Sequence, residues 1–206
     1  MTMLSDHLDA TRPGLPRAES APPPTNPTRR LVIVVRADPV ICGHSGEARN
    51  LAEAALTRGF DDVRIVTWPI PALQAAGLPL KPLETVLPYS AGITVERPEP
   101  VGDYTVPDGR YLGGIVGRLV ELFTEDVPTV AMSLYLTPHD TAIAQAATIA
   151  RSTGMCAPLT TIAEAVGSDI RIVVRSALDE GRFGAAAQVL STDLSIDVCV
   201  AVWELT

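Results

Sequence analysis

The chain has 206 residues, of which 47% are hydrophobic, which is enough for one domain with a proper core and hardly enough for two. Its formal net charge is −8 and its Lys and Arg residues are scattered, which argues against nucleic acid or an anionic membrane surface as a partner. The three cysteines are far apart, so neither a disulfide framework nor a CxxC metal site is expected. The composition predicts no membrane span, no secretory signal and a cytoplasmic location.

Residues 1–29 are rich in Pro, with polar and charged neighbours and no apolar periodicity, and are predicted to form a disordered tail. The folded domain is expected over residues 30–206. It opens with the strand 31–35, whose β-branched run is typical of a parallel sheet covered by helices on both faces. A helix is predicted from Gly46 to Arg58.

Gly59 is expected to end this helix, and a second strand follows at 63–67. Prolines then recur from residue 69 to 107, and this segment is predicted to be a long loop. Its polar side chains suit a polar ligand such as a sugar, and the alternative is a surface excursion without a ligand. These side chains are Tyr89, Ser90, Glu96, Arg97, Asp103, Tyr104, Asp108 and Arg110. The charged ones are interpreted first as solvated loop charges and second as acceptor-binding groups.

Helices and strands alternate over the rest of the chain. The expected helices span 111–123, 138–152 (with Thr137 as N-cap), 168–178 and 183–190, and the expected strands span 127–134, 157–162 and 197–203. This alternation predicts an α/β fold with a single Rossmann-like, doubly wound and mostly parallel sheet.

The loop after the first strand carries two glycines around a histidine and a serine: Gly43, His44, Ser45 and Gly46. Because the helix is expected to start at Gly46, its free N–H groups point into the crevice above the sheet, where phosphates and sugars bind. There His44 is expected to be neutral and to hydrogen-bond a sugar hydroxyl, whereas Ser45 either caps the helix or binds phosphate. Alternatively, the glycines serve only the turn and His44 faces solvent. The spacing matches neither the G-x-G-x-x-G fingerprint nor a P-loop.

His139 falls in the first turn of a later helix, at the same carboxyl edge of the sheet as His44. Both imidazoles are expected to contact a sugar. No third ligand follows at a suitable spacing, so no metal site is predicted. No catalytic residue is assigned. Asp38, directly after the first strand, is either a general base or, as turn chemistry favours, part of a turn.

Cys42 and Cys199 are expected to be small core hydrophobes. A nucleophilic pair of Cys42 with His44 is disfavoured, because residues two apart in a loop rarely align and no third group orients them.

Four segments carry a resemblance to a known family: Gly43-His-Ser-Gly-Glu-Ala-Arg-Asn50, Leu56-Thr-Arg-Gly-Phe60, Val63-Arg-Ile-Val-Thr-Trp68 and Asp197-Val-Cys-Val-Ala-Val202. With these, residues 31–202 resemble the N-terminal domain of GT-B glycosyltransferases of the family 4 type. The resemblance implies that the glycine-bearing loop faces an interdomain cleft, near the donor phosphates and the acceptor.

After Val202 the sequence reads Trp-Glu-Leu-Thr, where that family continues into a second Rossmann domain that supplies most nucleotide-sugar contacts. The resemblance therefore implies an acceptor-side domain for sugar transfer from a nucleotide-sugar donor to an acceptor hydroxyl, with no further cofactor, and this chain alone is expected to be inactive. The expected partners are the nucleotide sugar, a small-molecule or glycan acceptor, and either a second Rossmann domain or another copy of the chain.

Two alternatives remain open. The first is a non-catalytic Rossmann-like module that uses the same crevice to bind a small polar ligand or a partner subunit. The second is a tetrapyrrole chelatase-like protein, which also begins with a strand, a histidine-containing loop and an Ala-rich helix. The intervening Arg36-Ala-Asp-Pro39 speaks against the second alternative, because a chelatase histidine usually follows the first strand directly.

Overall fold

The computed structural model describes residues 29–35, 43–68, 87–101, 109–136, 138–166 and 174–202. The strands of its sheet are β1 (Arg30–Val34), β2 (Asp62–Val66), β3 (Ile93–Glu96), β4 (Thr129–Leu134), β5 (Leu159–Val166) and β6 (Val198–Val202). They lie in the order β3-β2-β1-β4-β5-β6, and every neighbouring pair is parallel. This is the Rossmann-like α/β fold that the alternating pattern predicts.

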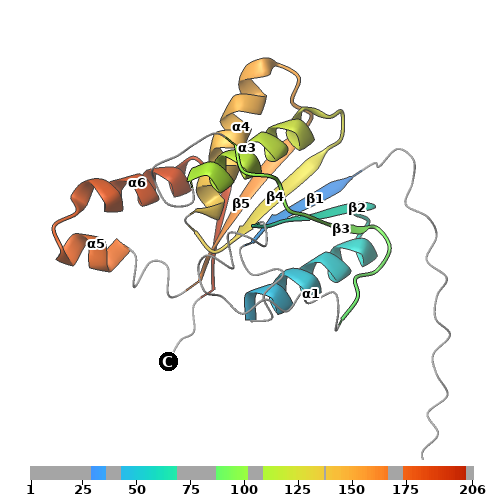
Figure 1. Cartoon of the computed structure of the whole chain (residues 1–206), viewed down its shortest axis with the longest axis horizontal. Coiled ribbons are helices and arrows are strands. Elements are labelled where there is room, and N and C mark those ends of the chain that lie inside the picture. Colours follow the sequence, from blue (N-terminus) through green and yellow to red (C-terminus); the bar gives the residue numbers. More distant parts are fainter. Residues whose placement is uncertain are drawn as a thin grey trace, which may run out of the picture.

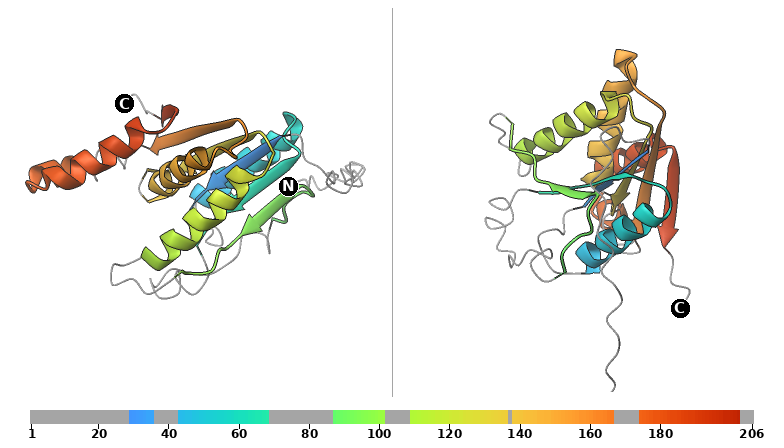
Figure 2. Two further views of the ribbon diagram at one scale, coloured as in Figure 1. Left: turned by 90° about the horizontal axis from the view of Figure 1, so that it is seen from above. Right: turned by 90° about the vertical axis from the view of Figure 1, so that its right-hand side faces the viewer.

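Helices cover both faces of the sheet (Figure 1). Helix α1 (Gly43–Thr57) packs on one face, and α3 (Gly109–Thr124) and α4 (His139–Thr153) pack on the other. Helices α5 (Arg175–Asp179) and α6 (Phe183–Leu194) follow β5 and extend away from the sheet (Figure 2, left). The described residues contain no helix that is long and apolar enough to cross a membrane.

Strand β1 shows why its β-branched run belongs at the centre of this sheet. Leu31 and Ile33 pack with α1, whereas Val32 and Val34 belong to the core beneath α3 and α4. Every residue of the strand is buried, because successive side chains point to opposite faces and both faces are covered.

The start of α1 differs from the sequence-based prediction. The helix begins at Gly43 and not at Gly46, so the predicted glycine loop forms the first helical turn. A Cβ added at Gly43 or Gly46 would meet no atom within 4 Å, so packing does not require glycine at either position. At the other end, Gly59 has φ +84° and stops the helix as predicted.

Strand β3 lies inside the segment that the sequence predicts to be a loop, and that prediction was wrong here. Four residues are enough to pair with β2 in parallel, from Val63 opposite Ile93 to Val66 opposite Glu96. Gly92, with φ +97°, leads into the strand and accepts a hydrogen bond from the N–H of Val63 at 3.0 Å. The prolines on both sides of this short strand are typical of a loop, which is why the sequence did not indicate a strand here. Residues 69–86 and 102–108 of the predicted loop lie outside the described residues.

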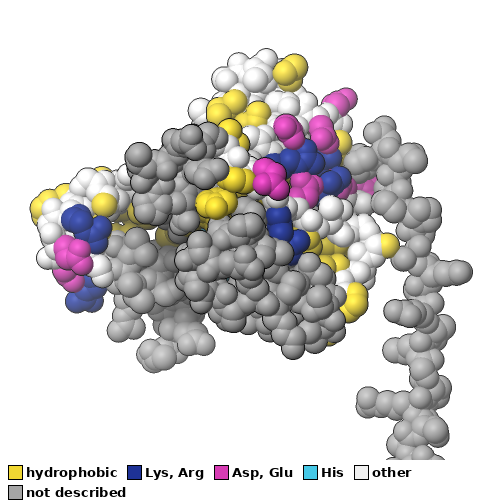
Figure 3. All heavy atoms as spheres, in the orientation of Figure 1, with side chains coloured by type: hydrophobic (Ala, Val, Ile, Leu, Met, Phe, Trp, Pro, Cys, Tyr) yellow, Lys and Arg dark blue, Asp and Glu magenta, His cyan; other side chains and the backbone are white. Residues whose placement is uncertain are grey.

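Glu96 is not the solvated loop charge that the sequence suggested, because it accepts hydrogen bonds from two arginines. Arg118 Nε lies 2.5 Å from its Oε2, and Arg64 Nη1 lies 2.7 Å from its Oε1. Although burial acts to raise it, these hydrogen bonds hold the pKa of Glu96 below its ordinary value. Arg64 also bonds Asp62, which binds the buried Arg30 at 2.7 Å. Charged side chains of both signs accordingly gather in one area of the surface (Figure 3).

Other boundaries also differ from prediction; α6, for example, ends at Leu194 and not at residue 190. β5 covers Leu159–Val166 and so extends four residues beyond the predicted end of this strand. Helix α4 begins at His139 with Pro138 as its N-cap residue, in place of the predicted Thr137, which lies outside the described residues. The predicted helix 168–178 is described only in part, and α5 occupies its end.

The predicted disordered tail lies almost wholly outside the described residues, which begin at Arg29. The backbone N–H of Arg29 donates to Asp61 Oδ1 at 3.0 Å, and its guanidinium lies 4.4 Å from the centre of the Phe60 ring. These contacts show that residue 29 belongs to the folded domain.

Candidate functional site

The strand order places a topological switch point between β1 and β4. Neighbouring chain connections leave these two strands in opposite directions, and in open parallel sheets ligands bind at the carboxyl ends of such strands. Helix α1 follows β1 and helix α4 follows β4, so the first turns of both helices lie at this edge. The five predicted binding residues all belong to these first turns: Gly43, His44, Ser45, Gly46 and His139.

His44 packs against Tyr135, which follows the end of β4. Their ring centroids are 3.7 Å apart with an interplanar angle of 51°. Tyr135 has φ +74°, a left-handed backbone conformation that is costly for a bulky residue. Such strain is concentrated at ligand and catalytic sites. The contact connects the two sides of the switch point, since His44 comes from α1 and Tyr135 directly follows β4.

Substitutions at Tyr135 will separate its ring contact from its backbone strain. We expect Tyr135→Gly to be more stable than Tyr135→Ala by about 1–2 kcal/mol, because both lose the ring and only glycine adopts positive φ without cost. Chemical denaturation of the two variants measures this difference. Equal stabilities would show that the backbone of Tyr135 relaxes and stores no strain.

His139 is held by Trp68, the second residue after β2. The indole Nε1–H of Trp68 donates to Nε2 of His139 at 3.3 Å, and both side chains are buried. Because an indole can only donate, Nε2 must be the acceptor nitrogen, and the neutral imidazole carries its hydrogen on Nδ1. Tyr111 of α3 packs edge-on against Trp68, with ring centroids 6.2 Å apart. Trp68 therefore fixes both the ring orientation and the tautomer of His139.

Two serines at this edge are fully buried. Ser45 lies in the first turn of α1, and its burial favours a structural role over phosphate binding. Ser133 lies in β4, and its Oγ has no hydrogen-bond partner among the described residues. A buried hydroxyl without a partner is rare in folded proteins and is often a sign of a missing water or ligand.

Asp140, next to His139, is a buried carboxyl with an altered protonation equilibrium. Its Oδ1 accepts the backbone N–H of Thr141 at 2.6 Å, whereas no donor among the described residues reaches its Oδ2. Burial, together with the nearby carboxyl of Asp193, raises the pKa of Asp140 to about 7. Asp140 therefore exchanges its proton near neutral pH.

The raised pKa of Asp140 predicts a pH dependence of stability. Between pH 3.8 and about 7 the folded state keeps a proton that the unfolded state has lost, so the free energy of unfolding falls as the pH rises. Asp140→Asn removes this ionisation, and we expect it to gain stability relative to the parent at pH 8 but not at pH 4. Thermal unfolding at both pH values checks this, with the exposed Asp126→Asn as control. A parallel response of the two variants would contradict it.

Around the first turn of α1, a shallow hollow of about 590 Å³ is lined by Gly43, Gly46, Glu47, Asn50 and Leu51. Among the described residues that line it are one carboxylate, one amide and one leucine, and no basic side chain. The Glu47 carboxyl also interacts with the carboxyl of Glu164 of β5, which is buried. Burial, followed by the Glu47 carboxylate, raises the pKa of Glu164.

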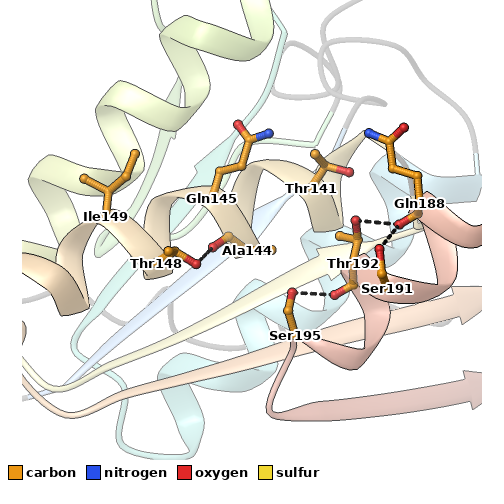
Figure 4. Close-up of a pocket in the computed structure, with 9 residues that line it drawn as sticks. All are labelled: Thr141, Ala144, Gln145, Thr148, Ile149, Gln188, Ser191, Thr192 and Ser195. Atoms are coloured by element: carbon orange, nitrogen blue, oxygen red, sulfur yellow. Dashed lines mark hydrogen bonds between the residues drawn. The ribbon is translucent and has the colours of Figure 1, made fainter.

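A second hollow of about 450 Å³ lies between α4 and α6 (Figure 4). Its hydroxyls are used within their own helices. Thr148 donates to the carbonyl of Ala144 at 2.8 Å, and Ser191 and Thr192 donate to that of Gln188 at 2.9 and 3.0 Å. The amides of Gln145 and Gln188 are the other polar groups of this hollow, and no histidine or charged side chain is among its described lining residues. The edge of the sheet at β1 and β4, which has two histidines, is therefore the better candidate site.

Two other predictions concern cysteines and metals. Cys199 is not a core residue, because it is exposed on β6. Partial desolvation of its thiol, followed by the carboxyls of Asp193 and Asp140, raises its pKa, which disfavours a reactive thiolate. Within the described ranges, no group of three or more His, Cys, Asp or Glu side chains is placed to hold a metal ion. Asp38 and Cys42 lie outside the described residues.

Fold and site together define a Rossmann-like α/β protein in which the first turns of α1 and α4 lie at the switch point of its sheet. A comparison with protein-family models finds none that matches the chain, and a comparison with curated proteins likewise finds no match. The class of protein therefore rests on the fold and the crevice.

Sequence reasoning missed four residues of this site: Trp68, Tyr135, Ser133 and Asp140. Their positions at or just beyond strand ends, and directly after His139, were the available signal. The strained backbone of Tyr135 leaves no trace in the sequence.

Proposed function

We propose that the crevice binds a nucleotide sugar or its acceptor, and that the chain serves as the acceptor-side domain of a glycosyltransferase. One observation carries this proposal: two imidazoles, from α1 and α4, lie at the carboxyl edge of the sheet on either side of its switch point. Imidazoles and backbone N–H groups are suited to sugar hydroxyls and phosphates.

In such a transfer, the bond between the anomeric carbon and the donor phosphate oxygen breaks and the nucleoside diphosphate leaves with the bonding electrons. The acceptor oxygen bonds to that carbon, and its proton passes to the leaving phosphate or to solvent. His139, buried and oriented by Trp68, would form the inner wall of the site behind the ligand. The backbone N–H groups of the first turn of α1 would donate hydrogen bonds to phosphate or sugar oxygens. His44, fixed by Tyr135, would complete the polar wall. No catalytic base is assigned.

A second candidate function is a non-catalytic module that binds a small polar ligand. It is favoured by the acidic surroundings of the hollow at α1. Glu47 lines this hollow and interacts with Glu164, and no Lys or Arg is among the described lining residues. An anionic diphosphate would meet like charge there, whereas a neutral sugar or polyol would not.

Calorimetric titration with nucleotide sugars, free nucleotides and neutral sugars tests both candidates. We expect saturable binding of a nucleotide sugar by the parent chain, with a loss of about tenfold or more in His44→Ala, because one hydrogen bond to a buried ligand group is worth about 1–2 kcal/mol. His7→Ala is the matched control, because His7 is the third histidine of the sequence and belongs to neither α1 nor α4.

Gly46→Ala adds a test of close backbone approach. The added methyl group has open space in the free protein, so we expect normal or slightly higher stability together with weaker ligand binding. Binding of neutral sugars alone would favour the module. Nucleotide-sugar binding that is unchanged in both His44→Ala and Gly46→Ala would contradict the proposed site.

A further inference from the structure

The outer side of α6 carries an apolar stripe without a described partner. Phe183, Ala187, Leu190 and Leu194 are spaced four, three and four residues apart and share one face of the helix. All four are exposed, Phe183 to 67% and Leu194 to 87%. This is the spacing with which helices pack against each other, and exposing it to water is unfavourable.

The stripe faces away from the core and from the groove between α6 and α4. Ala186, Val189 and Asp193 form the side that packs inward, and Gln188 and Ser191 line the groove toward α4 (Figure 4). A helical turn of 3.6 residues places the stripe on the remaining side. Because α4 lies over β4 and β5, the direction away from α4 is that of the free edge of the sheet, at β6.

Strand β6 is an edge strand of the described sheet, and its own sequence lacks the charges and prolines that usually protect such strands. It pairs with β5 on one side and has no described strand on the other (Figure 2, right). Its sequence, Val-Cys-Val-Ala-Val, contains no charge and no proline, and Val198 and Val200 are each 42% exposed. The opposite edge, β3, ends in Glu96 and is followed by Arg97 and Pro98, which are typical devices against edge pairing.

The surface formed by α6 and β6 is also nearly free of charge. Residues 183–202 contain two charged side chains, Asp193 and Asp197. Asp197 accepts hydrogen bonds from Arg151 at 2.7 Å and from the Thr161 N–H at 2.8 Å. The carboxyl of Asp193 raises the pKa of Asp140 and of Cys199. Interface cores are depleted of charge in the same way, whereas ordinary surface is not.

We propose that α6 and β6 form a homodimer interface, in which β6 of two copies pair in antiparallel orientation around Val200. The six-stranded sheet of each copy then continues into the other, and the two α6 stripes meet across the same two-fold axis. Centring the pairing on Val200 sets each Val200 opposite its copy and places position 198 opposite position 202. This interface is independent of what the crevice binds.

The second copy is the occupant that this surface fits best. Two chains of net charge −8 repel each other, so association favours a surface that brings few like charges together. The surface of α6 and β6 meets this condition. An uncharged strand paired with itself opposes apolar residues throughout, and β-branched pairs stabilise such ladders. A stable dimer buries about 1,200–2,000 Å², more than five paired residues supply, which is why the stripe on α6 must take part.

Sedimentation velocity of the full chain over a concentration series tests the proposal. We expect a dimer whose dissociation constant rises about tenfold or more in Val200→Lys and in Leu194→Lys, because each brings like charges together at the axis or the stripe. Met155→Lys, at a 65% exposed methionine outside this surface, is the matched control and should leave the dimer unchanged. Circular dichroism verifies that each variant is folded.

A cross-link then tests the register. In a chain whose three cysteines are replaced by alanine, Val200→Cys should form a disulfide-linked dimer rapidly on mild oxidation, and Val198→Cys should not. A parent chain that stays monomeric at every concentration overturns the proposal and leaves β6 as an edge for a strand of another protein. A dimer that resists both lysine variants, or that cross-links equally at 198 and 200, overturns the proposed pairing.

Discussion

Replacing Asp62 with alanine is expected to lower the free energy of unfolding by about 3 kcal/mol or more. Asp62 Oδ2 accepts from Nε of Arg30 at 2.7 Å, and Arg30 is only 1% exposed. Asp62 also binds Arg64. Without the carboxylate, Arg30 keeps the carbonyl of Leu122 and the half-exposed Glu125, which leaves a buried guanidinium short of one charge partner.

Glu125→Ala supplies the matched control, because Glu125 binds the same arginine from a side chain that is 46% exposed. Solvent screens this pair, so we expect a loss of about 0–1 kcal/mol. Urea denaturation of both variants gives the comparison. If Asp62→Ala proved as mild as Glu125→Ala, Arg30 would have to reach water in the folded protein, and the buried network would not be a source of stability.

Gly114→Ala is expected to destabilise the protein by about 1–3 kcal/mol. A Cβ at position 114 of α3 would lie less than 3.0 Å from the carbonyl oxygen of Glu99. That oxygen belongs to the backbone, so no rotamer change relieves the overlap and either α3 or the segment after β3 must move. Helix α3 also holds β3 through the ion pair of Arg118 with Glu96. The substitution therefore strains the side of the sheet where β3 pairs.

Gly117→Ala on the same helix should have the opposite sign. An added Cβ there meets nothing within 4 Å, so replacing glycine in the helix interior should stabilise by about 0.5–1 kcal/mol. Thermal unfolding of the two variants reveals whether the close approach at Gly114 is real. Stabilisation by both substitutions would mean that the backbone at Glu99 yields without cost.

Helix boundaries near the candidate site show how far local patterns reach. Gly59 was recognisable as the end of α1 because helices commonly end at a glycine, which adopts positive φ freely; its φ is +84°. The start of α1 was not, since Gly43, His44 and Ser45 are as compatible with a turn as with a first helical turn. A turn and a first helical turn differ here only in their backbone hydrogen bonds, and packing of α1 on the sheet determines which of the two forms.

Charged residues show a limit of a different kind. Glu96 followed by Arg97 and Pro98 has the composition of a solvated loop, yet Glu96 ends a strand and binds two arginines from β2 and α3. Arg64 and Arg118 lie 32 and 22 residues away in sequence. No local pattern links residues at such separations, because the pairing of β2 with β3 brings them together.

By itself, the sequence determined the α/β class, the buried central strand β1, and the arrival of His44 and His139 at one edge of the sheet. These follow from hydrophobic periodicity and from the fact that helices after parallel strands begin at the same edge. Only the tertiary structure decided that Trp68 fixes His139, that Tyr135 is strained against His44, and that β6 is an exposed edge. These features depend on contacts and burial between segments distant in sequence, which local propensity does not encode.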